Sequence, residues 1–267
     1  MDKHAWDTHA QNTQERDRQA RIASNLSCVM RQIQAATQAY QAKAGITGHK
    51  VKLIAVSKYQ SLESIFALYL AGQYAFGENR VQDLRQKTGE LERLLAQPQV
   101  APKPQISQAP QTPIEWHFIG TLQRNKINAL LSLRPTLIHS IDSLELALAL
   151  DERCKAQGRI QPVLLQVNAA NEPSKHGFSL ESTCDAFAQI RAHTSHLRLQ
   201  GLMTIGAHTQ DISAVVESFA RTKALYDTLR AAYSDVETLS MGMSGDFMHA
   251  IMQGANMVRI GSALFSG

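Results

Sequence analysis

The sequence contains little of what marks secreted, membrane or metal-binding proteins. Its three cysteines, Cys28, Cys154 and Cys184, are far apart and form no CxxC pair, which argues against a disulfide framework and a zinc site. No apolar run reaches the ~18 residues that span a bilayer, and the polar start of the chain lacks the apolar core of a secretory signal. We therefore expect a protein of a reducing, cytoplasmic compartment with no membrane contact.

Clusters of charge and of metal ligands are missing as well. The 27 basic residues exceed the 23 acidic ones, but they are scattered and form no stripe with interleaved aromatic residues. We expect no nucleic-acid partner, although the net charge of +4 favours a phosphorylated ligand. His193 and His196 have no third ligand nearby, so we interpret them as surface residues and expect no metal.

Proline is scarce outside one segment. Residues 97–113 hold five of the eight prolines and show neither a helical nor a strand period. This Pro- and Gln-rich composition is typical of an extended or mobile loop within a domain, and we assign no chemistry to it.

What the chain does have is a regular alternation of strand and helix patterns. A flexible tail is expected over 1–11 and a long amphipathic helix over 12–44. Short, β-branched apolar runs predict strands at 51–57, 74–79, 114–120, 136–142, 160–168, 197–205, 237–243 and 257–265. Helical patterns lie between them at 61–73, 80–96, 123–133, 143–157, 179–193, 211–232 and 246–254.

Strands of this kind, joined by helices, indicate a parallel sheet with both faces covered. Eight such units favour a single (β/α)8 TIM barrel over residues 12–267, with the first long helix as an extra N-terminal element. A doubly wound open sheet is the alternative, but its GxGxxG fingerprint is absent from the first strand–helix turn.

Barrel enzymes build their sites at the carboxyl ends of the strands, which draws attention to Lys58, directly after the strand at 51–57. Burial beside the core would lower the pKa of its amine and favour the neutral form that attacks an aldehyde. An ordinary solvated lysine is the alternative.

The loops after the last two predicted strands have the composition of a phosphate site. GMSGDF at 242–247 and RIGS at 259–262 offer exposed backbone N–H groups, small residues and hydroxyls. In barrels, phosphate is often bound after strands seven and eight. The residues concerned are Ser244, Gly245, Gly261 and Ser262.

Arg259 and His117 both stand inside apolar runs. A buried arginine needs a partner, which for Arg259 is either a ligand or a carboxylate such as Glu78. His117, in WHFIG, either faces the barrel mouth or is satisfied in the core, and the sequence leaves both readings open.

Taken in order, several segments resemble the pyridoxal phosphate homeostasis proteins, whose fold-type III barrel is similar to the N-terminal domain of alanine racemase. The resemblance runs from residue 51 to the end, apart from 97–113. The matching segments are LIAVSK (53–58), FGENRVQD (76–83), EWHFIGTLQRNK (115–126), HSIDS (139–143), VLLQVN (163–168), LRLQGLM (197–203), LSMGMS (239–244) and MVRIGSALF (257–265).

The resemblance implies a cofactor and a role for each matching residue. Lys58 would bind pyridoxal 5'-phosphate covalently as a Schiff base, and Arg259 would face its pyridine nitrogen. Asn79 would line the ring side of the pocket. The phosphate would be held by Ser244, Gly261 and Ser262, with Met243 behind the loop. The implied partners are this small molecule and PLP-dependent apoenzymes that receive it, and we expect a monomer rather than an obligate oligomer.

Some positions depart from the family's pattern. Tyr59 and Ser262 stand where threonine is usual, Gly245 where an acidic residue is frequent, and His249 where glutamate is frequent. Arg124 replaces a usual serine, and SKHGF carries His176. We expect these differences to affect the affinity for the cofactor rather than its identity.

The same resemblance bears on whether the protein is an enzyme. A guanidinium donates only, so Arg259 would keep the pyridine nitrogen unprotonated and the ring a poor electron sink. Racemases of this fold add a second base with the help of a C-terminal β-domain, for which a chain ending at Gly267 has no room. We therefore expect a non-catalytic carrier or buffer. A racemase-like enzyme and a barrel enzyme acting on a phosphorylated sugar are the alternatives.

Overall fold

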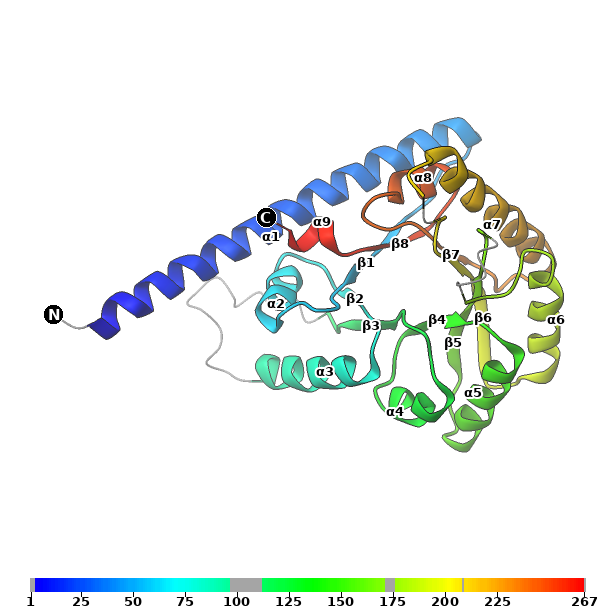
Figure 1. Ribbon diagram of the computed structural model, residues 1–267, viewed down its shortest axis with the longest axis horizontal. Coiled ribbons are helices and arrows are strands. Elements are labelled where there is room, and N and C mark those ends of the chain that lie inside the picture. The colour runs from blue at the N-terminus through cyan, green and yellow to red at the C-terminus, as the bar shows by residue number, and fades with distance from the viewer. Residues whose placement is uncertain (1–2, 97–111, 171–175, 208, 267) are drawn as a thin grey trace.

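A closed barrel of eight parallel strands forms the centre of the molecule, in the order β1 to β8 (Figure 1). The computed structural model describes residues 3–96, 112–170, 176–207 and 209–266. The strands are β1 (Lys52–Val56), β2 (Ala75–Glu78), β3 (Glu115–Phe118), β4 (Leu137–Ile141), β5 (Gln161–Val167), β6 (Leu197–Thr204), β7 (Thr238–Ser240) and β8 (Met257–Ile260). The predicted barrel is confirmed, and the open-sheet alternative is wrong.

Helices surround the barrel on its outside (Figure 1). They are α1 (Lys3–Ala44), α2 (Leu62–Leu70), α3 (Val81–Ala96), the 3-10 turn η1 (Arg124–Lys126), α4 (Ile127–Leu131), α5 (Leu144–Ala156), α6 (Thr183–His193), α7 (Ile212–Ala232), α8 (Phe247–Met252) and α9 (Ser262–Phe265). None of the helices in the described ranges is long and apolar enough to cross a membrane.

The first and last strands of the barrel are neighbours. β1 pairs with β8, with Ile54 opposite Arg259, and on its other side with β2. Because all strands are parallel, their carboxyl ends share one rim of the barrel. Residues just after β1 and β8 are therefore adjacent although they are far apart in the chain.

Two apolar clusters form the core. The larger lies between the strands and the surrounding helices. The smaller takes one residue from each of six strands and so fills the barrel interior, as Ile54, Ala75, Leu137, Leu164, Met203 and Met257.

The structure differs from the predicted elements at three places. α1 begins at Lys3, before the predicted start at residue 12, because residues 3–44 contain neither glycine nor proline to interrupt a helix. β8 ends at Ile260, and Ser262–Phe265 form α9 instead of the predicted strand. The Gly261 N–H bonds the Ser244 side chain rather than a neighbouring strand, which ends β8. The predicted helix 123–133 is divided into η1 and α4, and most of the 97–113 segment lies outside the described residues.

Helix α1 lies along α2, α8 and α9, and its N-terminal part extends away from the barrel (Figure 1). Its Asn25 side chain donates to the carbonyl oxygens of Leu264 and Ser266, at 3.2 and 2.9 Å. These carbonyls belong to the end of α9, where the helix offers no N–H partner of its own. Asn25 thus links α1 to the C-terminal end of α9.

Candidate functional site

Lys58 lies in a tight turn at the carboxyl end of β1. The Ser57 N–H donates to Gly77 O of β2, and the Gln60 N–H donates to Ser57 O, both at 3.0 Å. Tyr59, the third residue of this turn, has a φ of 64°, a conformation that usually selects Gly or Asn. The Lys58 side chain is exposed, which agrees with the solvated alternative and not with burial of its amine beside the core.

A buried network fixes the residue before Lys58. Ser57 Oγ donates to Glu78 Oε1 at 2.7 Å. Lys87 Nζ, from α3, donates to Ser57 O at 2.7 Å and to the same carboxylate oxygen at 2.5 Å. Sequence reasoning missed this arrangement because Ser57, Glu78 and Lys87 belong to three elements and share no local period.

The two predicted phosphate loops contact each other. Ser244 Oγ accepts hydrogen bonds from the N–H groups of Gly261 and Ala263, at 3.2 and 3.4 Å. Gly242, before the first loop, has a φ of 96°, and a Cβ there would lie 2.6 Å from Ala250 Cβ, so only glycine fits. Asp246 Oδ1 accepts from the Met243 N–H at 2.5 Å and closes the first loop.

The second loop also touches the end of β1. A Cβ on Gly261 would lie 3.3 Å from Val56 Cβ and 3.4 Å from Val56 O. The loop therefore approaches the backbone close to Lys58. Ser262 begins α9 and is exposed, so its hydroxyl is accessible at this rim.

Arg259 is 5% exposed and is held by oxygen atoms of neighbouring strands. Nη1 donates to Ser240 O at 2.9 Å and to Ser240 Oγ at 2.8 Å, while Nη2 donates to Thr204 O at 2.9 Å. Burial lowers the pKa of Arg259 to about 10, against the opposing charge of Asp246. In the described parts of the chain it forms no ion pair, and Glu78, the alternative partner, pairs with Lys87 instead.

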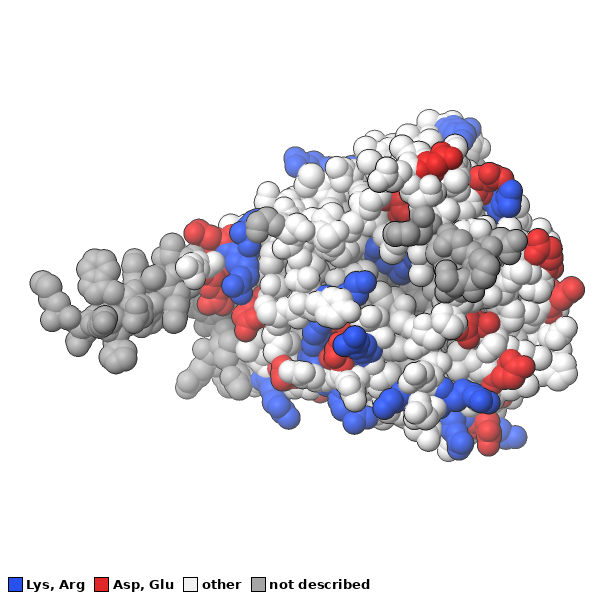
Figure 2. Space-filling view, in the orientation of Figure 1, with Lys and Arg blue, Asp and Glu red and all other residues white. Residues whose placement is uncertain are grey.

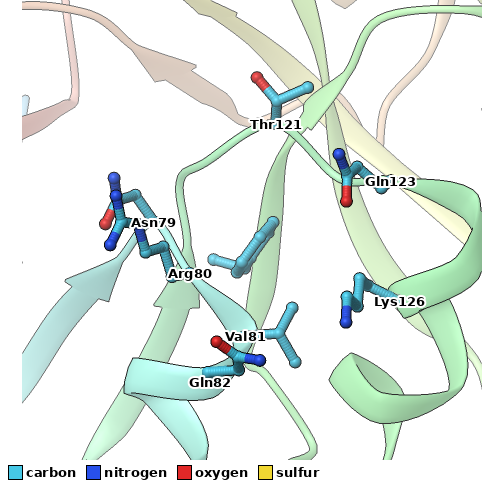
Figure 3. A pocket seen from close by; sticks show the side chains of 8 residues that line it. Asn79, Arg80, Val81, Gln82, Thr121, Gln123 and Lys126 are labelled. Atoms are coloured by element: carbon cyan, nitrogen blue, oxygen red, sulfur yellow. The ribbon is translucent and has the colours of Figure 1, made fainter.

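Asn79 follows β2 and has a buried Oδ1 without a hydrogen-bond partner among the described residues. It lines a cavity of about 310 Å³ together with Arg80, Val81, Gln82, Phe118, Thr121, Gln123 and Lys126. Figure 3 shows these side chains around the cavity, contributed by the β2–α3 and β3–η1 segments on its two sides. The Arg80 guanidinium lies 5.8 Å from the centre of the Tyr59 ring, which connects this cavity to the Lys58 turn.

A second cavity, of about 550 Å³, borders the predicted phosphate loop at 242–247. Met243, Gly245, Asp246 and His249 line it, and Ile205 and Ile212 are among the residues opposite. Two positions that depart from the family's pattern, Gly245 and His249, therefore face this cavity. The N–H groups of Gly261 and Ala263 are directed to Ser244, on the other loop.

Two histidines occupy the barrel interior. His117, which the sequence left open between mouth and core, is 1% exposed, and its Nδ1 lies 2.9 Å from Nε2 of His139. His139 Nδ1 lies 3.1 Å from Ser240 Oγ. Burial lowers the pKa of both imidazoles. The HSIDS segment contains His139, but nothing in it indicated contact with His117.

His193 ends α6, and His196 lies just before β6. His193 Nδ1 lies 2.7 Å from the Gln189 carbonyl oxygen, and His196 Nδ1 lies 2.9 Å from Ser195 Oγ. The described residues contain no group of three or more His, Cys, Asp or Glu side chains that could hold a metal ion. Figure 2 shows Lys and Arg side chains near the middle of the face in view as well as at its edge.

The assembled groups have a clear chemical character. Neighbouring strands of the barrel carry an accessible primary amine just after β1, two backbone N–H groups and a hydroxyl in the loops after β7 and β8, and a buried guanidinium on β8 without a carboxylate partner in the described residues. An amine can condense with an aldehyde, N–H groups and hydroxyls bind phosphate oxygens, and a guanidinium donates to a ring acceptor. These residues therefore have the chemistry to bind a small phosphorylated aldehyde.

Comparisons with known proteins agree with this character. Residues 18–267 match the family "Alanine racemase, N-terminal domain". The pyridoxal phosphate homeostasis protein of Helicobacter pylori strain 26695 is 49% identical over 81% of this chain and 88% of its own length. That of Escherichia coli K12 is 35% identical over 91% of this chain and 95% of its own. PipY of Synechococcus elongatus PCC7942, solved with PLP bound, is 29% identical and has a TM-score of 0.73, over 92% of this chain and 100% of that one.

Proposed function

Because the chain belongs to the pyridoxal phosphate homeostasis protein family, we propose that it binds pyridoxal 5'-phosphate (PLP) and acts in PLP homeostasis inside the cell, as a carrier or buffer. The observation that carries this proposal is that Lys58, Arg259 and the Ser244–Gly261 contact belong to β1, β7 and β8 or to the loops after them, which are neighbours in the barrel. PLP bound to PipY supports the identity of the ligand.

Each residue has a defined task in this proposal. Lys58 joins the cofactor through a Schiff base, and Arg259 donates to the pyridine nitrogen. Ser244, Gly261 and Ser262 hold the phosphate, Met243 supports their loop, and Asn79 lines the ring side. When bound, PLP supplies an aldehyde that condenses reversibly with amines.

The Lys58 turn suits reversible binding. The amine is exposed, so an incoming aldehyde or a competing amine can reach it. The Ser57–Glu78–Lys87 network fixes the backbone from which Lys58 projects. A fixed backbone with an accessible amine favours reversible binding of PLP over its permanent retention.

Arg259 fits a carrier that has no second catalytic base, although racemases of this fold tolerate an arginine at the same place. Its guanidinium only donates hydrogen bonds, so a ring nitrogen facing it stays unprotonated. An unprotonated ring withdraws electrons weakly from a carbanion. A racemase-like enzyme is the alternative, and incubation with L-alanine and L-serine tests it. Formation of the D-isomers well above the rate with free PLP would contradict the carrier role.

Covalent binding is tested with the purified protein and PLP. We expect a yellow absorbance that borohydride bleaches, with the cofactor then fixed to the peptide that contains Lys58. Lys58→Ala should lose this chromophore, and Lys155→Ala, at an exposed lysine on α5, should keep it. A Lys58→Ala protein that carries the same reducible chromophore would sink the proposal.

Delivery needs a separate experiment. PLP-loaded protein is mixed with a PLP-dependent apoenzyme in the presence of a trap for free PLP, and the recovered enzyme activity is measured. We expect faster recovery than with the same amount of free PLP and trap. Equal recovery would support a buffer that releases PLP to solution and contradict direct transfer.

A further inference from the structure

A row of buried polar side chains crosses the barrel interior, starting at Arg259. Arg259 Nη1 lies 2.8 Å from Ser240 Oγ, which lies 3.1 Å from His139 Nδ1. His139 Nε2 lies 2.9 Å from His117 Nδ1. His117 Nε2 faces Glu115 Oε2 at 3.7 Å, too far for a hydrogen bond but close enough for attraction to its charge. The row thus joins β8, β7, β4 and β3.

Only one arrangement of hydrogen atoms uses every donor in this row. A guanidinium cannot accept, so Ser240 Oγ accepts from Arg259, and His139 Nδ1 is the one group of the row that can accept the hydroxyl hydrogen of Ser240. His139 then carries its hydrogen on Nε2 and donates to His117 Nδ1. His117 in turn carries its hydrogen on Nε2, facing Glu115. Arg259 therefore sets the direction of the whole row.

The surroundings keep both histidines neutral. Each is at most 1% exposed, and burial lowers both pKa values. The charged groups that face the row are Arg259 at one end and Glu115, paired with Lys52, at the other. A protonated His139 could no longer accept from Ser240, which would leave a buried hydroxyl hydrogen without an acceptor.

We propose that His139 and His117 are positioning residues that hold the Arg259 guanidinium in place for the ring nitrogen of PLP, an inference that rests on the function proposed above. Ser240 receives two bonds from Nη1, and Thr204 O receives one from Nη2, so rotation of the guanidinium would break all three. His139 stabilises this orientation because its Nδ1 accepts the hydroxyl hydrogen of Ser240, which leaves the lone pairs of Ser240 Oγ to accept from Arg259. His117 accepts from His139 Nε2 and so keeps the His139 hydrogen on that atom. A planar guanidinium held this way presents its remaining N–H groups in one fixed direction.

The tautomers provide a test that needs no cofactor. Nitrogen-15 NMR of histidine-labelled protein distinguishes Nδ1–H, Nε2–H and doubly protonated rings, and His117→Gln and His139→Asn variants assign the two signals. We expect the neutral Nε2–H form for both residues at neutral pH. An Nδ1–H or doubly protonated His139 would overturn the inference.

Ser240→Ala breaks the row at one hydroxyl and leaves the Ser240 main-chain bond to Arg259 intact. We expect a mixture of His139 tautomers, a shifted absorbance of the bound cofactor, and PLP binding weaker by roughly 3- to 10-fold. Ser218→Ala removes a hydroxyl that is also buried, on α7, and should change none of these. Ser240→Ala protein with the binding and spectrum of Ser218→Ala would contradict the positioning role.

His139→Asn supplies the rescue. Its side-chain oxygen can accept from Ser240 in place of Nδ1, so PLP binding should stay closer to wild type than in His139→Leu, which offers no acceptor. Equal losses in the two variants would mean that volume rather than the hydrogen bond matters. If wild-type protein forms no reducible adduct with PLP, the proposed function fails. The NMR experiment uses no cofactor, so it tests the hydrogen-bond arrangement of the row independently of PLP binding.

Discussion

A buried ion pair holds the backbone from which Lys58 projects. Lys87 and Glu78 form a buried ion pair that also fixes Ser57, the residue before Lys58. A buried carboxylate that loses its partner is far more costly than an exposed one, because it has neither water nor a counter-ion. Stability and cofactor capture thus depend on the same pair.

Lys87→Met is expected to destabilise the protein by about 3–5 kcal/mol, since it leaves the Glu78 charge buried and unpaired. PLP binding should weaken as well, because Ser57 loses a bond to its carbonyl. Urea unfolding followed by circular dichroism measures the first effect. Lys87→Met combined with Glu78→Gln should recover part of the loss. A double variant no more stable than the single one would contradict the ion-pair explanation.

Gly245 is expected to tolerate a side chain. A Cβ there meets no atom within 4 Å, and its φ is not positive. Gly245→Ala should therefore raise the free energy of unfolding by about 0.4–1 kcal/mol through a less flexible unfolded chain. Thermal unfolding measures this change in stability. Gly242→Ala, where a Cβ collides with Ala250, should destabilise the protein instead.

At the scale of elements, α1 supports the loop that precedes α9. Asn25 bonds two carbonyl oxygens at the end of α9, and α9 begins directly after Gly261. Asn25→Ala should lower the free energy of unfolding by about 1–2 kcal/mol, because two hydrogen bonds are lost. It should also speed PLP release, measured by stopped-flow absorbance. Gln34→Ala, at an exposed position of α1, serves as control, and identical release rates in the two variants would exclude this support.

The elements also show how far the sequence could predict this molecule. The strands predicted at 51–57 and 257–265 were recognisable because each is a short, β-branched apolar run, although β8 ends at Ile260. Lys58 and the 242–247 loop follow from their places at strand ends. The contacts among Ser57, Glu78 and Lys87, and those of Ser240 with His139, depend on the register between strands. Local patterns carry no information about register, so these contacts were not predictable.

At the scale of the whole molecule, the buried histidines give the folded state a defined response to acid. Burial lowers the pKa of His139 well below its ordinary value and that of His117 as well, so the unfolded chain binds protons that the folded chain does not. Stability is therefore complete above the unfolded pKa of about 6.5 and falls as the pH drops below it. Contacts with His117 and Lys52 hold the pKa of Glu115 at about 2, so its contribution is lost only between about pH 4.5 and 2.

The free energy of unfolding should fall by roughly 1–2 kcal/mol between pH 6.5 and 5.5, because each buried histidine contributes about 1 kcal/mol over this interval just below the unfolded pKa. Urea titrations at several pH values measure this slope. His139→Asn should make the slope shallower by about half. An unchanged slope in that variant would mean that other groups cause the acid response.

The pairing of β1 with β8 has a consequence for how the protein is made. During translation Lys58 leaves the ribosome long before Arg259 and Ser262 are added. A nascent chain that lacks β8 holds the reactive amine but neither the guanidinium nor the second phosphate loop. In the proposed function, tight cofactor uptake therefore begins only when the barrel has closed, and ligand binding then stabilises the closed form over any opened one.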